Sequence, residues 1–235
     1  MLANLGRRIG TLLFSGSCFL CRGKAADILC AQCDADLPRL REPLCPRCAL
    51  ASPGGAVCGR CLTQPPHYDA TVAALAYAFP ADVLVHALKF RSELALASLF
   101  GNILAEKVVA TERVDVLLPV PLSAKRLRSR GFNQALEIAR YVARAAGAPL
   151  SPELCERTRD TPPQLDLPMD ERARNVRGAF HCPKLVAGAR IAVLDDVMTT
   201  GTTLDEVAAT LKRAGADRVV NWVIAKTTFP AYLPA

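Results

Sequence analysis

Short apolar runs alternate with amphipathic segments over most of this chain. The apolar runs have the length of strands, and the segments between them repeat apolar residues every three or four positions, as helices do. The predicted strands cover residues 71–79, 114–118, 190–197 and 218–226, and the predicted helices cover residues 80–91, 96–104, 132–146 and 203–214. Strands that alternate with helices predict an α/β domain with a mostly parallel sheet flanked by helices, which binds ligands at the carboxyl ends of its strands.

The amino-terminal part of the chain lacks this pattern and is rich in cysteine and proline. The composition changes at Gln64-Pro65-Pro66, so we predict a small module at residues 1–64 and a single α/β domain at residues 65–235. Residues 9–14 are apolar but are interrupted by a glycine and a threonine, which favours a short amphipathic helix over a secretion signal.

Composition narrows the class of protein. At 235 residues and 51% hydrophobic, the chain can build one sizeable core with a small appendage, or two modest domains. The longest unbroken apolar run, residues 72–79, is far too short to cross a bilayer, so no membrane insertion is expected. The formal charge of +7 is weak evidence for a polyanionic partner.

Eight of the ten cysteines lie before residue 62 in four Cys-x-x-Cys pairs. Each pair can give two thiolates to one tetrahedral ion, so we expect two structural zinc sites with four thiolate ligands each. Similar spacings within the two halves favour sequential pairing, with the first two pairs on one ion, although an interleaved arrangement stays open. The predicted zinc ligands are Cys18, Cys21, Cys30, Cys33, Cys45, Cys48, Cys58 and Cys61.

A disulfide framework is the alternative use of these cysteines. It is less favoured because the chain has no convincing signal peptide and carries the phosphate-binding pattern described next, which together indicate the reducing cytoplasm. A module with few aliphatic residues cannot bury much core, so metal binding should supply its folding free energy. Each zinc with four thiolates adds −2, which would lower the net charge from +7 to +3. Cys155 and Cys182 lie outside this spacing and are interpreted as small buried hydrophobic residues.

The strongest functional pattern lies at residues 191–204. Four apolar residues predict a buried strand, Asp195 and Asp196 stand at its carboxyl end, and a turn of threonine and glycine opens the next helix. Backbone N–H groups and hydroxyls at such a helix start can surround a phosphate, and Gly201 allows a close backbone approach. The two acids would repel a phosphate and should face a neutral diol, so the pattern indicates a ribose 5-phosphate. The predicted 5′-phosphate-binding residues are Val197, Met198, Thr199, Thr200, Gly201, Thr202 and Thr203.

Two further segments are expected at the same edge of the sheet. A basic loop follows the strand at residues 114–118, and we expect its Lys125, Arg126 and Arg130 to bind a leaving pyrophosphate because arginine engages phosphate oxygens in bidentate fashion. A solvated turn and a nucleic-acid contact are the alternatives for this loop. Residues 157–180 are rich in proline and charge, which fits a mobile hood that closes over the sugar or a solvated loop.

These motifs carry a resemblance to known proteins. Residues 193–203 resemble the phosphoribosyl pyrophosphate (PRPP) signature of type I phosphoribosyltransferases. The order of motifs along nearly the whole chain resembles the ComF/GntX family, with an amino-terminal double zinc ribbon. The motifs that carry it are the Cys-x-x-Cys pairs, His86-Ala-Leu-Lys89-Phe-Arg91, Pro119-Val-Pro121, Arg130-Gly-Phe-Asn133-Gln134, Gln164, Arg172-x-x-Asn175-Val176, Phe180 and the Asp195-Asp196 loop.

The resemblance implies a type I phosphoribosyltransferase fold that binds PRPP with Mg²⁺. Asp195 and Asp196 are then the expected catalytic residues, because they would position the ribose. His86 is interpreted as a packed core residue. The resemblance also implies a role in natural competence or in the use of DNA as a nutrient, with single-stranded DNA and other competence proteins as partners. Further site residues are expected at Lys89, Gln164, Arg172 and Asn175.

Two hypotheses follow for the function. The first is a cytoplasmic, zinc-containing, PRPP-binding protein that transfers the ribosyl phosphate to an acceptor that the sequence does not identify. The second is a non-catalytic module that binds single-stranded DNA and uses the PRPP pocket as a sensor.

Overall fold

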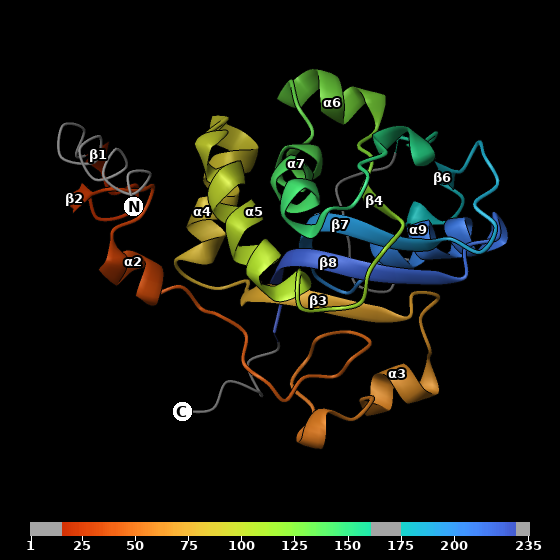
Figure 1. The fold of residues 1–235 in the computed structure, drawn as a ribbon. Coiled ribbons are helices and arrows are strands. Elements are labelled where there is room, and N and C mark those ends of the chain that lie inside the picture. Colours follow the sequence, from red (N-terminus) through yellow and green to blue (C-terminus); the bar gives the residue numbers. More distant parts are fainter. Residues whose placement is uncertain (1–15, 161–174, 229–235) are drawn as a thin grey trace, which may run out of the picture.

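The structure, a computed structural model, describes residues 16–160 and 175–228 (Figure 1). Its centre is a four-stranded sheet in the order β3 (Ala70–Ala76), β8 (Arg218–Lys226), β7 (Arg190–Met198) and β4 (Val116–Pro119). All three strand pairings are parallel, so the carboxyl ends of the four strands meet at one edge. The predicted α/β fold with a mostly parallel sheet is therefore confirmed.

Helices cover both faces of this sheet (Figure 1). On one face, α5 (Ala95–Val108) and α7 (Gln134–Ala146) pack on the strands, and α4 (Ala81–Arg91) packs beside α5. On the other face lies α9 (Thr202–Arg213). Side chains of β7 alternate between the two layers because successive residues of a strand point to opposite faces. Ala192 and Leu194 join the core with α5 and α7, whereas Ile191 and Val193 join the core with α9.

Helices α5 and α7 approach closely at Gly101. A Cβ atom added there would lie 2.4 Å from Cβ of Tyr141 and 3.3 Å from the carbonyl oxygen of Ile138. We expect Gly101→Ala to push the helices apart and to lower the free energy of unfolding by about 1–3 kcal/mol, the usual cost of overpacking a core. Urea denaturation measures this loss. Gly59→Ala is the control, since nothing lies within 4 Å of the added methyl group there, and equal stabilities of the two variants would contradict the close approach.

The amino-terminal region forms two small ribbons with the same backbone design. The first contains β1 (Gly16–Ser17), β2 (Lys24–Ala25) and α2 (Ala31–Ala35), and the second contains the 3-10 turn η1 (Pro53–Gly55) and α3 (Gly59–Thr63). Cys18 N–H donates to the carbonyl of Gly23 at 2.7 Å, and Cys45 N–H donates to Leu50 at the same distance. The residue after the second cysteine of each turn, Arg22 or Ala49, has a positive φ. The ribbons are thus structural repeats.

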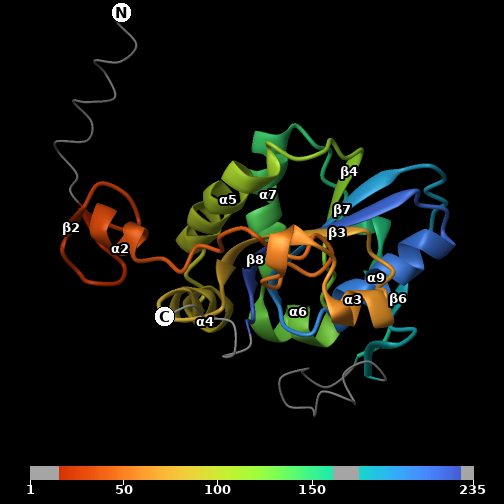
Figure 2. The ribbon, with the colours of Figure 1, turned by 90° about the horizontal axis from the view of Figure 1, so that it is seen from below.

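The two ribbons lie beside different parts of the α/β unit (Figures 1 and 2), and their buried residues belong to different cores. The segment between them runs along the outer edge of β3, where Leu40 N–H donates to Ala74 and Ala76 N–H donates to Pro38. This pairing covers an edge that would otherwise expose unpaired backbone groups. Buried cysteines of the second ribbon join the core that contains α9, whereas Cys18 of the first ribbon joins the core that contains α5. Contacts therefore cross the expected boundary near residue 64.

Some elements differ from the predicted ones. The basic segment is a helix, α6 (Ala124–Arg130), and not a loop, because the Ser123 hydroxyl caps its start by accepting from the Arg126 N–H at 3.3 Å. Helix α7 begins two residues later than predicted because the Asn133 side chain caps it. The short strands β5 (Glu156–Arg157) and β6 (Phe180–His181) and the 3-10 turn η2 (Pro152–Leu154) were not predicted.

Two further predictions concern the amino terminus and membrane insertion. The helix expected at residues 9–14 lies outside the described residues. Within the described ranges, no helix has the length and apolar character needed to cross a membrane.

Candidate functional site

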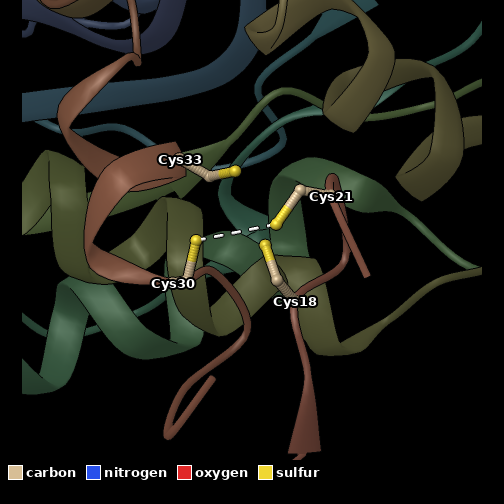
Figure 3. A group of neighbouring side chains, drawn as sticks. All are labelled: Cys18, Cys21, Cys30 and Cys33. Atoms are coloured by element: carbon tan, nitrogen blue, oxygen red, sulfur yellow. Dashed lines mark hydrogen bonds between the residues drawn. The ribbon is translucent and has the colours of Figure 1, made fainter. Parts of the chain in front are cut away.

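The eight paired cysteines form two clusters of four. The first contains Cys18, Cys21, Cys30 and Cys33, whose sulfur atoms converge in Figure 3, and the second contains Cys45, Cys48, Cys58 and Cys61. Within each cluster the ligand atoms lie within 4.8 Å of one another, so the sequential pairing is confirmed. The sulfur atoms of Cys21 and Cys30 are 3.7 Å apart, and those of Cys48 and Cys58 are 3.6 Å apart. A tetrahedral zinc site with bonds of about 2.3 Å needs a spacing of about 3.8 Å, so both clusters fit zinc.

The protonation of these thiols supports the same conclusion. Burial raises the pKa of Cys18, but backbone N–H groups of Cys21, Cys30 and Leu20 lower it more, to about 6. Burial and neighbouring thiols raise the pKa of Cys33 to about 12. Four thiolates therefore cannot share so small a volume without a cation, and a divalent metal would supply the missing charge.

The second cluster shows the same pattern. Burial raises the pKa of Cys45, but N–H groups of Cys58, Cys48 and Arg47 lower it to about 7. The Cys58 N–H lies 3.3 Å from the sulfur of Cys45. The pKa of Cys48 is raised by burial to about 11. The two remaining cysteines lie outside both clusters, as expected: Cys155 is buried, whereas Cys182 is only half-buried.

The predicted phosphate loop connects β7 to α9 at the carboxyl edge of the sheet. Gly201 is the residue before α9 and has φ 87°, so its conformation favours glycine. The hydroxyl oxygens of Thr200 and Thr202 lie 3.1 Å apart. A shallow hollow opens at the amino end of α9, where the helix dipole favours an anion. Its lining residues are Asp195, Val197, Met198, Thr199, Gly201, Thr202, Thr203 and Leu204.

The two acids of the loop have different surroundings, although their carboxyl groups interact with each other. Asp195 lines the hollow, whereas Asp196 faces α4, where Lys89 Nζ lies 2.6 Å from its carboxylate. The side chains of Lys89 and Asp196 are 18% and 4% exposed, so this is a buried ion pair. We expected both acids to face a diol, but Asp196 instead pairs with Lys89, which was itself expected among the further site residues.

These surroundings separate the pKa values of the two carboxyl groups. Burial, followed by the charge of Asp196, raises the pKa of Asp195 well above its usual value. Burial also raises the pKa of Asp196, but Lys89, followed by hydrogen bonds with Asp195 and the Gln134 amide, stabilises the carboxylate, so its pKa lies below the usual value. These surroundings favour the charged form of Asp196 and the neutral form of Asp195.

Basic side chains lie beside the acids. Arg130, at the end of α6, donates to the Gln134 side chain and lies over the ring of Phe90, with its central carbon 5.5 Å from the ring centre. Burial lowers the pKa of Arg130, whereas the charges of Asp196 and Asp195 raise it. Arg130, Gln134 and Asp196 thus form one polar network. Lys125 is exposed on the same helix, and Arg126 is half-buried.

The segment predicted as a hood is held at its base by β5 and β6. Arg157 lies over the ring of Phe180 at 5.4 Å, and burial lowers its pKa to about 10. The Ser123 hydroxyl donates to Asp160 at 2.5 Å, which ties this base to the start of α6. Asn175, another predicted site residue, lies before β6 and is half-buried. Two predicted site residues, Gln164 and Arg172, lie outside the described residues.

Sequence reasoning missed several residues of this region. Arg157 interacts with the charge of Asp195, and Gln134 stabilises Asp196, although neither was assigned a role. Lys226 at the end of β8 is 2% exposed and donates from Nζ to the carbonyl of Thr199 at 2.6 Å. Its position, a lysine at the end of an otherwise apolar strand, could have identified it from the sequence. His86, expected in the core, is exposed and its ring centre lies 4.6 Å from that of Phe90.

Comparisons with known proteins agree with these features. Residues 9–62 match the model of the double zinc ribbon domain. The chain is 34% identical over 226 residues to DNA utilization protein YhgH of Salmonella typhimurium. The aligned region covers 92% of this chain and 99% of the relative. It is 28% identical to competence protein F of Haemophilus influenzae, and the aligned region covers 91% of this chain and 98% of that relative. Among solved structures, glutamine PRPP amidotransferase from B. subtilis matches 54% of this chain and 25% of its own, at 25% identity and a TM-score of 0.38. The chain belongs to the ComF family of DNA utilization protein YhgH and competence protein F, as its motifs predicted.

Proposed function

We propose that this protein binds PRPP with Mg²⁺ at the carboxyl edge of its sheet and transfers the ribosyl phosphate to an acceptor in the cytoplasm. The observation that carries the proposal is the hollow at the start of α9, where the side chain of Asp195 and the threonine loop line one cavity. The loop would hold the 5′-phosphate, and Asp195 would meet the ribose hydroxyls. Relatives named for competence and DNA utilization support a role in the use or uptake of DNA.

The charges around the hollow support this orientation of the ligand. Arg130 and Arg157 both interact with the charge of Asp195, so we assign the pyrophosphate of the ligand to these two arginines. In the proposed reaction an acceptor attacks C1, the bond from C1 to the pyrophosphate oxygen breaks, and the pyrophosphate leaves as an anion. The arginines would stabilise that negative charge, which favours the transition state over the bound substrate.

Magnesium fits the same arrangement of donors. Mg²⁺ prefers oxygen ligands and binds through one or two carboxylates together with substrate phosphates. Asp195 offers a carboxyl group at the hollow, whereas the carboxylate of Asp196 is already paired with Lys89. When bound, the ion would neutralise part of the pyrophosphate charge. Alignment and charge stabilisation, with little acid–base chemistry, would then supply most of the rate enhancement.

The pairing of Asp196 with Lys89 suggests separate roles for the two acids. Asp196 accepts from the Gln134 amide, which in turn accepts from Arg130. We propose that Asp196 positions Arg130 through this network and that Asp195 contacts the sugar directly. The two roles differ in their expected variants, since loss of Asp196 also leaves the Lys89 ammonium without its partner.

Calorimetric titration with PRPP tests the proposal. We expect the wild-type protein to bind PRPP with Mg²⁺ and to bind more weakly after Mg²⁺ is chelated. Asp195→Ala should weaken binding about tenfold or more, because hydrogen bonds to the ribose hydroxyls are lost, and tenfold corresponds to about 1.4 kcal/mol. Asp27→Ala, an exposed acid of the first ribbon, is the matched control and should leave the affinity unchanged.

The same titration separates this proposal from its alternative. Unchanged PRPP affinity in Asp195→Ala would refute the assignment of the site. A wild-type protein that does not bind PRPP but binds single-stranded oligonucleotides in a salt-dependent manner would support the non-catalytic DNA-binding module instead. Exposed Lys125 and Arg128 on α6 would be the first residues to neutralise in that case.

A further inference from the structure

The second zinc ribbon lies directly against the phosphate loop. Arg60 of α3 donates from its guanidinium to the carbonyl oxygen of Thr200 at 2.9 Å, across 140 residues of sequence. Just after α3, the backbone N–H of His67 donates to the carboxylate of Asp205 at 2.6 Å, and the His67 ring lies 3.2 Å from the same carboxylate. Asp205 stands in the first turn of α9. The ribbon and the segment that follows it therefore contact both the loop and the helix start.

Two buried side chains support the loop beside these contacts. Lys226 donates to the carbonyl of Thr199 at 2.6 Å. Tyr68, which is 4% exposed, places its hydroxyl 3.0 Å from the position that a Cβ atom on Gly201 would take. Three consecutive residues of the loop, at positions 199, 200 and 201, are thus each held or contacted by a different side chain. Two of these side chains, Arg60 and Tyr68, come from the ribbon and the segment that follows it.

Helix α3 cannot hold Arg60 in place by itself. It has five residues, of which only Cys61 is buried, and it begins directly after Cys58. A helix this short is not stable alone, so its position depends on the two cysteines that flank Arg60. Both belong to the second four-cysteine cluster. The metal that fits this cluster would therefore fix the position of the Arg60 guanidinium.

The first ribbon gives a natural comparison, because it has the same backbone design without the contact. Its residue between Cys30 and Cys33 that corresponds to Arg60 is Gln32. Gln32 donates to Asp36 of its own ribbon at 3.2 Å. Of the two ribbons, therefore, only the second places a cation on the phosphate loop within the described residues.

We propose that Arg60 is a positioning residue and that the second cysteine cluster holds the phosphate loop in its binding conformation, so that metal at this cluster sets the affinity for the ribosyl phosphate. The inference deepens the proposed function and rests on PRPP binding at the loop. It assigns different roles to the two ribbons: the first leaves the loop unaffected, whereas the second preorganises it. A preorganised loop binds more tightly because less ordering is needed on binding.

Substitutions at matched positions of the two ribbons test the inference. Arg60→Gln should weaken PRPP binding roughly fivefold to tenfold, which is the size expected for loss of one charged hydrogen bond to a loop. Arg60→Lys should restore part of the affinity, and Gln32→Ala should change nothing. Zinc content must stay at two ions per chain in all three variants, so that the effect belongs to the side chain and not to a lost metal.

Removing one metal at a time extends the test. Cys58→Ser should lower zinc content by one ion and weaken PRPP binding, whereas Cys30→Ser, the equivalent change in the first ribbon, should lower zinc content equally and leave the affinity unchanged. Equal effects of the two serine variants, or unchanged affinity in Arg60→Gln, would overturn the inference. If Cys58→Ser does not fold, the Arg60 variants alone decide.

Hydrogen exchange keeps this test separate from that of the proposed function. In ligand-free protein, Arg60→Gln should speed exchange of the amides at residues 199–203, and Gln32→Ala should not. Faster exchange in a protein that does not bind PRPP would refute the proposed function and keep the positioning role. Normal PRPP binding with unchanged exchange and affinity in Arg60→Gln would refute the positioning role alone.

Discussion

Removing zinc with a strong chelator is expected to unfold the first ribbon completely. The strands of this ribbon have two residues each, α2 buries none of its side chains, and the four cysteines converge on one point. Structural zinc sites supply roughly 10–16 kcal/mol of apparent binding free energy, which far exceeds what so small a core can supply. The amides of Cys18 and Arg22, which donate to Gly23 and Cys18, should lose their protection. Hydrogen exchange, with elemental analysis of released zinc, measures both effects.

The second ribbon should respond less completely to the same treatment. Its buried cysteines share a core with α9 and the sheet, and Thr71 N–H donates to the carbonyl of Pro46. We expect α3 to lose protection while β3 and β8 keep theirs. Cys182→Ser serves as a control, because this cysteine lies outside both clusters and should leave the zinc content at two ions per chain. Ribbon amides that stay protected after complete chelation would show that disulfides or apolar packing, and not metal, stabilise this region.

Much of the α/β unit could be predicted because its elements have strong periodicity. The expected strand at residues 218–226 has the bounds of β8, and the helix expected at residues 203–214 is shifted by one residue in α9. The cysteine pairs predicted both clusters because a tetrahedral ion requires this spacing. The phosphate loop was recognisable because a strand, two acids and a glycine turn follow one another in the sequence.

Other features depend on contacts between distant segments, which local patterns do not record. The basic segment around Arg126 lacks the apolar periodicity that would predict a helix. It forms one because the Ser123 side chain caps its first turn. The contact of Arg60 with Thr200 joins residues 140 positions apart. The ion pair between Asp196 and Lys89 likewise joins two distant segments of the chain.

Lys89→Met is expected to lower the free energy of unfolding by about 3–5 kcal/mol at neutral pH, because it removes one partner of a buried ion pair. Nζ of Lys89 lies 2.6 Å from Asp196, whose side chain is 4% exposed. In the variant a buried carboxylate would remain without its cation. Denaturation by urea measures the loss, and Lys184→Met, a change at an exposed lysine, should cost little. The double variant Lys89→Met/Asp196→Asn should recover much of the stability, because no uncompensated charge remains.

The pH dependence of this loss gives an independent test. In the wild type Lys89 holds the pKa of Asp196 below its usual value, despite burial, so the pair stabilises the fold at neutral pH and this contribution is lost only as pH falls through that lowered pKa. In Lys89→Met the charge that opposes the effect of burial on Asp196 is lost, so the pKa of Asp196 rises. The unfolded state then releases its proton at a lower pH than the folded state, so the variant becomes less stable as pH rises. The stability gap between variant and wild type should therefore widen as pH rises above about 4, the usual pKa of an aspartate, and comparison at the same pH cancels the contribution of zinc. A gap that is constant with pH would mean that Lys89 acts through packing of its aliphatic chain and not through its charge.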